Sequence, residues 1–76
     1  MTMQHTGNTA FAVEMAKELA ADHSTADPIT TIEWVARQWG MILTEGQKLR
    51  LLAVRADLLT GVFGKRDMPK ACIAAL

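Results

Sequence analysis

The side chains that could act as nucleophiles, bases or metal ligands are few and lie far apart in the sequence. His5 and His23 are the two histidines, and Cys72 is the single cysteine. Their separations match neither a metal-ligand spacing nor a nucleophile–base pair, both of which need several such groups brought together. Glu14 and Glu18 stand four residues apart, a spacing typical of a solvated helix surface. We therefore expect neither a catalytic centre nor a metal site.

Cofactor-binding motifs are also absent from the sequence. The chain contains no GxxxxGK[ST] and no GxGxxG pattern, and Gly61 and Gly64 are a lone pair of glycines rather than a phosphate-binding loop. Cys72 is the fifth residue from the C-terminal end, whereas prenylation requires the fourth. A single cysteine allows no internal disulfide, which argues against a disulfide-stapled secreted scaffold. We expect no cofactor and no small-molecule substrate.

Length and composition limit the remaining function classes. The 76 residues, 50% hydrophobic and 21% charged, suffice for one small packed domain and are too few for separate cofactor and substrate lobes. Eight basic residues balance eight acidic ones, so the strongly basic charge typical of nucleic-acid binders is missing. The longest nearly uncharged apolar stretch, residues 40–44, is far shorter than the roughly 20 residues that cross a bilayer, and no signal-peptide pattern is visible. We expect a cytoplasmic protein that does not contact a membrane.

Hydrophobic periodicity predicts an all-α fold with three helices. The predicted helices span residues 9–22, 31–39 and 45–60. Residues 1–8 have no periodicity and are expected to form a flexible arm, whereas residues 9–76 form a single domain. The C-terminal tail, which ends in ACIAAL, either adds a short helix or packs as an extended segment.

Capping residues support these boundaries. Asn8 or Thr9 is expected to cap the first helix. The capping-box spacing, a hydroxyl followed three residues later by Glu or Gln, predicts the start of the second and third helices. The two boxes are Thr30 with Glu33 and Thr44 with Gln47. Gly40 and Gly61 follow the expected ends of these helices, where a left-handed residue is favoured.

Trp34 has two interpretations. The predicted core stripe of the second helix contains Ile32, Val35, Ala36 and Trp39, and Trp34 points roughly the other way. Its ring could fold back over Ile29 as a hydrophobic staple at the helix start. Alternatively, it could be an exposed anchor for a partner, because tryptophan is enriched among interface hot spots. The two interpretations could hold for the two sides of one ring.

The third predicted helix has more apolar residues than one core face needs. One stripe contains Leu49, Leu52, Ala56 and Leu59, and a second, rotated stripe contains Leu51, Val54 and Leu58. Either the helix is sandwiched between the other helices and the apolar tail, or one stripe docks a second copy or another protein. We favour docking, because small chains commonly gain stability by oligomerising. The predicted contact residues are Trp34, Leu51, Val54 and Leu58, and the predicted assembly is a homodimer.

A helix-turn-helix corner gives an alternative hypothesis. Ala36 and Gly40, with apolar neighbours, have the spacing that lets two helices approach closely in helix-turn-helix proteins. The pattern then departs from that class, because Gly46 stands where a branched apolar residue is expected and Ile42 and Leu43 stand at DNA-facing positions. The alternative is a dimeric DNA-binding regulator. Its phosphate contacts would be Arg37, Gln47, Lys48 and Arg50.

The main hypothesis is a non-enzymatic interaction module whose partner is another protein or a second copy. The charge is uneven along the chain: residues 1–27 carry one basic and four acidic residues, and residues 65–76 carry three basic and one acidic. Such an asymmetry can orient a charged partner. By class, we expect a small phage or mobile-element inhibitor of a larger host or defence complex, comparable to the anti-CRISPR proteins.

Overall fold

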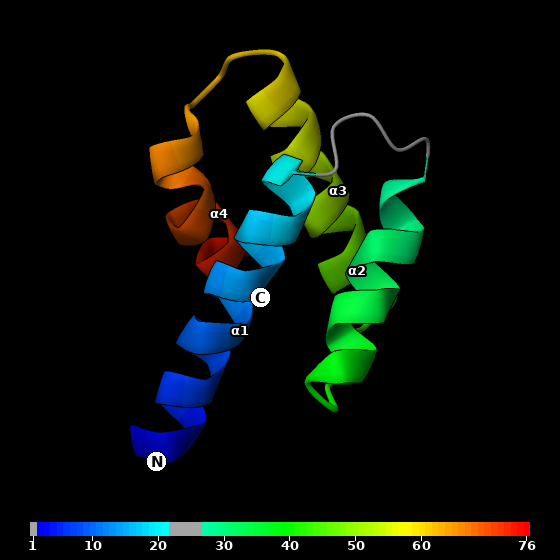
Figure 1. Ribbon diagram of the computed structural model, residues 1–76, viewed down its shortest axis with the longest axis vertical. Helices are drawn as coiled ribbons and strands as arrows, with labels where there is room; N and C mark the ends of the chain where they lie inside the picture. The colour runs from blue at the N-terminus through cyan, green and yellow to red at the C-terminus, as the bar shows by residue number, and fades with distance from the viewer. Residues whose placement is uncertain (1, 22–26) are drawn as a thin grey trace.

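The computed structural model describes residues 2–21 and 27–76 of the protein, and within these ranges it contains helices and no strand. The all-α prediction is therefore confirmed. The four α-helices and one short 3-10 helix are α1 (Thr2–Ala21), α2 (Pro28–Gln38), α3 (Glu45–Leu59), η1 (Lys65–Asp67) and α4 (Met68–Ala75). In Figure 1, α4 lies beside α1 and runs in the opposite direction, while α2 and α3 occupy the other side. Among the described helices, none is long and apolar enough to cross a membrane.

Helix α1 begins earlier than its periodicity indicates. Residues 2–8, which we expected to form an arm without structure, are the first two turns of the 20-residue helix. The prediction considered only where apolar residues recur. Once residues 9–21 are held by packing, however, each residue added to the helix gains a hydrogen bond at little further cost, so the helix extends N-terminal to the periodic apolar residues.

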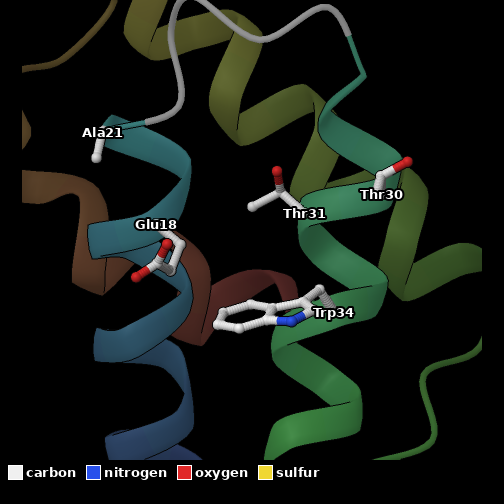
Figure 2. Close-up of a pocket in the computed structure, with 5 residues that line it drawn as sticks. All are labelled: Glu18, Ala21, Thr30, Thr31 and Trp34. Atoms are coloured by element: carbon white, nitrogen blue, oxygen red, sulfur yellow. The ribbon is translucent and has the colours of Figure 1, made fainter.

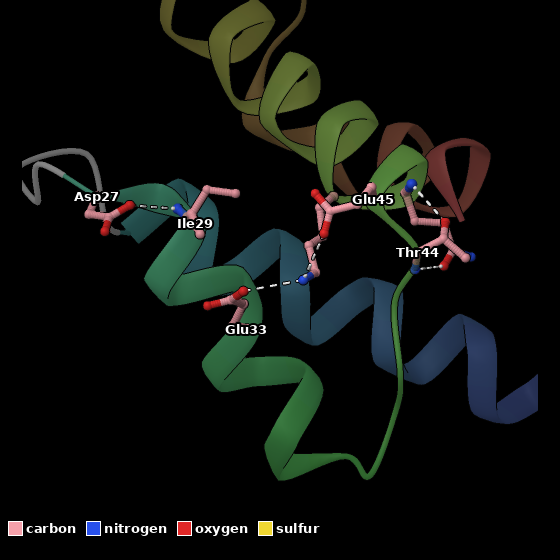
Figure 3. A network of polar contacts seen from close by, with 7 residues as sticks. Asp27, Ile29, Glu33, Thr44 and Glu45 are labelled. Atoms are coloured by element: carbon pink, nitrogen blue, oxygen red, sulfur yellow. Dashed lines mark hydrogen bonds and ion pairs between the residues drawn. The ribbon is translucent and has the colours of Figure 1, made fainter.

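Helix α2 also begins earlier than expected, and its cap is a different residue. Asp27 has non-helical backbone angles, φ −123° and ψ 89°, and its Oδ1 accepts a hydrogen bond of 3.1 Å from the Ile29 N–H (Figure 3). Thr30, the predicted cap, instead lies inside the helix and donates its hydroxyl proton to Asp27 Oδ2 at 2.8 Å. Pro28 explains the change, because its fixed φ suits the first helical position and leaves Asp27 as the cap. The predicted capping box of Thr30 with Glu33 is therefore wrong.

The end of α2 follows the prediction. Gly40 has a φ of +64°, in the left-handed region. The Met41 N–H donates to the Ala36 carbonyl at 2.8 Å and the Gly40 N–H donates to the Arg37 carbonyl at 3.1 Å. This pair of hydrogen bonds is the Schellman motif, which satisfies carbonyls that the helix end leaves unpaired. The chain consequently turns sharply toward α3.

Helix α3 has the predicted signals at both of its ends. The Gln47 N–H donates to Thr44 Oγ1 at 3.1 Å, and Gln47 Oε1 accepts from the Thr44 N–H at 2.8 Å, which completes the capping box. At the other end, Gly61 has a φ of +81°. The Val62 N–H bonds the Asp57 carbonyl at 2.9 Å, so α3 also ends in a Schellman motif.

The core lies between the four helices and contains side chains from each of them. Phe11, Met15 and Leu19 of α1 are buried, as their four-residue spacing predicts. The other helices contribute Ile32, Val35, Ala36, Leu51, Val54, Met68, Cys72 and Ala75. Burial of the Cys72 thiol raises its pKa to about 11. The tail is therefore helical and part of the core, which resolves the two conformations that its sequence left open.

Side chains of α3 hold the C-terminal end of α4. Arg50 Nε donates to the Ala75 carbonyl oxygen at 2.9 Å, and Gln47 Nε2 donates to the main-chain oxygen of Leu76 at 3.1 Å. The last carbonyls of a helix have no partner within the helix, and a positive side chain also interacts favourably with that end of the helix dipole. These two contacts join segments that are 25 and 29 residues apart in sequence.

Replacing Gly40 by Ala tests the left-handed turn. A Cβ there would meet no atom within 4 Å, so the cost comes only from the backbone conformation. We expect Gly40→Ala to lower the free energy of unfolding by about 1 kcal/mol, or the melting temperature by roughly 4–8 °C. Gly64, with φ −94° and equally open surroundings, is the matched control, and Gly64→Ala should not destabilise. Thermal unfolding followed by circular dichroism is the measurement. Equal melting temperatures for the two variants would contradict the left-handed conformation of Gly40.

Candidate functional site

Trp34 lines an open groove between α1 and α2. The side chain is 50% exposed, and its indole extends from α2 toward α1 (Figure 2). The groove has a volume of about 290 Å³. Its other lining residues, Glu18 and Ala21 from α1 and Thr30 and Thr31 from α2, lie together on one side of the ring (Figure 2). The indole face thus forms the floor, and two helices form the walls.

Helical geometry accounts for this arrangement. Thr30 and Thr31 precede Trp34 by four and three residues, so all three share one face of α2. Side chains in an α-helix lean toward its N-terminus, which places the indole beneath the turn that carries the threonines. On α1, Glu18 and Ala21 are likewise three residues apart. The buried side chains of the core hold α1 and α2 together below the groove.

The chemistry of the groove favours a positively charged ligand. The face of an indole ring carries negative electrostatic potential, and the Glu18 carboxylate lies on the same side of it. Among residues 9–21 and 27–76, no ion pair or hydrogen bond engages the Glu18 carboxylate. Thr30 Oγ1 donates to Asp27, and its lone pairs remain as acceptors. The lining therefore combines an aromatic face, a carboxylate and a hydroxyl.

The structure removes the basis for the staple interpretation of Trp34. That interpretation requires the helix to start after Thr30, whereas α2 is capped by Asp27. The indole is instead exposed over the groove, as the anchor interpretation requires. Sequence reasoning identified Trp34 but missed Glu18, Ala21 and Thr31. Thr31 shares a face of α2 with Trp34. The proximity of Glu18 and Ala21 to Trp34 depends on the register between α1 and α2, which no residue pattern in either helix specifies.

Trp39 is less buried than we expected. It was placed in the core stripe of α2 but is 42% exposed. Its ring packs against Phe11 in an edge-to-face arrangement, with the ring centroids 6.1 Å apart and the planes at 62°. Because Trp39 is the C-cap of α2, it lies where the core ends and only part of its ring is covered.

The apolar stripe of α3 that we expected to contact another chain is the one that faces the core. Leu51 and Val54, expected at a contact with another chain, are 0% and 9% exposed, and Leu58 packs partly buried against the core. The stripe that faces outward includes Leu49 and Leu59, which are 62% and 54% exposed. Helix α4 packs against α3, and its Met68, Cys72 and Ala75 belong to the same buried cluster as Leu51. Leu51, Val54 and Leu58 therefore lie on the face of α3 that the rest of the chain covers, and not on an open contact surface.

The predicted phosphate contacts mostly have other partners. Lys48 Nζ lies 3.2 Å from Glu33 Oε2 and 3.5 Å from Glu45 Oε2 (Figure 3), and its hydrogen bond with Glu33 raises the pKa of Lys48. Gln47 completes the cap of α3 and contacts the end of α4, where Arg50 is also bound. Of these four residues, only Arg37 is exposed and has no ion pair or side-chain hydrogen bond with another described residue. The four residues therefore do not form one open basic surface.

In the part of the chain that the structure describes, no three His, Cys, Asp or Glu side chains are grouped so that they could hold a metal ion. Cys72 is buried in α4. Comparisons of the chain with protein-family models, with curated proteins and with solved structures found no match.

A pair of matched substitutions tests which apolar stripe of α3 faces the core. Leu51→Ala should lower the free energy of unfolding by about 2–5 kcal/mol, because it leaves a cavity in the core. Leu49→Ala, two residues away on the outward stripe, should change it by about 0.5 kcal/mol or less. Urea denaturation measures both values. A larger loss for Leu49→Ala would mean that the stripes are oriented as the sequence alone suggested.

A titration with duplex DNA tests the helix-turn-helix alternative. We expect no binding that depends steeply on salt, since Lys48, Gln47 and Arg50 are bound within the chain. Fluorescence anisotropy of a labelled duplex at about 50 and 200 mM salt is the measurement, because a protein that contacts several phosphates loses affinity strongly over that range. A tight complex at low salt that dissociates at high salt would restore the DNA-binding hypothesis.

Proposed function

We propose that the protein is a non-enzymatic interaction module and that the Trp34 groove is its contact surface for a partner. The observation that carries this proposal is the half-exposed indole at the floor of a groove between two helices that the core holds in place. Burying a tryptophan is among the largest single contributions to a protein interface. A ring mounted on a packed helix also loses little conformational freedom on binding, which favours affinity.

Two kinds of partner fall within the proposal, another protein and a second copy of the chain. Static light scattering of the isolated protein at micromolar concentration separates them. A monomeric mass assigns the groove to another protein. A dimer that Trp34→Ala converts to a monomer assigns it to a second copy.

The more specific form of the proposal is an inhibitor. A chain of 76 residues that presents one aromatic anchor can act by covering a surface of a larger assembly. We propose that the assembly is a cytoplasmic host or defence complex and that the protein comes from a phage or another mobile element. Its small size supports this form, because occupying a surface needs no substrate-binding lobe.

Partner capture tests the proposal directly. Tagged protein is used to purify partners from host-like lysate, with Trp34→Ala and Ile73→Ala as matched variants, since the two residues are 50% and 46% exposed on different helices. We expect Trp34→Ala to lose the specific partner, at a cost of about 2 kcal/mol or more in binding, and Ile73→Ala to retain it. Circular dichroism should show both variants folded. Retention of every partner by folded Trp34→Ala would contradict the proposed contact surface.

A further inference from the structure

We propose that the Trp34 groove binds an arginine side chain of the partner, with the guanidinium lying on the indole face and paired with the Glu18 carboxylate. This inference rests on the proposed function, because it names the chemistry that the same groove recognises. The occupant is an arginine presented by another protein. The shape of the groove, the charge of its described residues and the fit of a planar cation favour this occupant.

The shape is a floor with two walls. The five lining residues enclose about 290 Å³ that is open to solvent on one side. In Figure 2, Glu18 and Thr31 lie on the same side of the ring, while the oxygen of Thr30 points away from it. A flat group that enters along the ring can therefore contact the aromatic face and the carboxylate together.

The charge around the groove is negative. Glu14 precedes Glu18 by one turn on α1, and neither carboxylate has an ion-pair partner among the described residues. Ala21 is the last residue of α1, and the carbonyl end of a helix favours cations. The opposing N-terminal end of α2 is capped by the Asp27 carboxylate, which offsets its positive potential. Lys17 is the one basic residue on this part of α1, and it is exposed next to Glu18 in the sequence.

Arginine fits this lining better than lysine. A guanidinium is planar, stacks on aromatic rings and presents donors in a fork that matches a carboxylate. The ammonium group of lysine can approach the ring and the carboxylate. It cannot lie flat on the ring while donating two parallel hydrogen bonds to the carboxylate.

The test uses the whole protein and a single-residue probe. N-acetyl-arginine methylamide is titrated into ¹⁵N-labelled protein while the two indole N–H signals are followed by NMR. N-acetyl-citrulline methylamide is the neutral probe of the same shape, and N-acetyl-lysine methylamide is the cation without a planar fork. We expect the Trp34 signal to shift and saturate at millimolar arginine probe, with the Trp39 signal unchanged.

Glu18→Gln should weaken the arginine probe about tenfold, whereas Glu45→Gln, on an exposed carboxylate of α3, should not. An unchanged Trp39 signal reports that Glu18→Gln is still folded. The inference is overturned if the Trp34 signal does not respond, if citrulline or lysine shifts it as strongly as arginine, or if Glu18→Gln binds as tightly as the wild type.

The two proposals can fail separately. If the arginine probe does not bind but Trp34→Ala loses a partner in the capture experiment, the interaction module stands and the arginine inference is wrong. If the probe binds at Trp34 through Glu18 but folded Trp34→Ala retains every partner, the groove chemistry stands and the proposed contact surface is wrong.

Discussion

The packing of α4 against α1 is the contact on which the rest of the structure depends. Both helices bring small buried residues to the core, among them Ala12 and Ala16 from α1 and Cys72 and Ala75 from α4. Small side chains allow two helices to approach closely, and close approach increases the apolar area removed from water. An eight-residue helix is too short to persist alone, so α4 exists because it is packed. Once it is in place, it covers the Leu51 stripe of α3 and leaves the Leu49 stripe facing outward.

Local signals in the sequence located the end of α2 and both ends of α3 but could not rank competing caps at the start of α2. The Thr44 and Gln47 box and the glycines at positions 40 and 61 are each supported by hydrogen bonds. Asp27 and Thr30 are both good caps three residues apart, and the choice between them depends on the backbone constraint that Pro28 imposes. The two stripes of α3 are similarly ambiguous. Both are rich in leucine, so only the position of α4, a tertiary contact, decides which is buried.

The candidate site shows the same division between local and long-range information. Trp34 could be predicted to lie off the core face, because the helical period of α2 sets its direction. Glu18 could not be assigned to it, because the pairing of α1 with α2 depends on how their buried side chains pack in the shared core. For Lys48, a contact that is distant in the sequence removes a role that its local position suggested. Its position on α3 suggested an open basic surface, whereas Glu33, 15 residues earlier, neutralises it.

The burial of Cys72 makes its thiol a reporter of how often α4 detaches. With its pKa raised to about 11, the thiol remains protonated at neutral pH, and it is fully enclosed while α4 is docked. Thiolate is the reactive form of cysteine. Alkylating reagents and oxidants therefore react with Cys72 only when α4 opens and exposes the sulfur to water. The rate of modification then measures the local opening equilibrium rather than the chemistry of an exposed sulfur. Gln47 and Arg50, which bind the main chain at the end of this helix, oppose that opening.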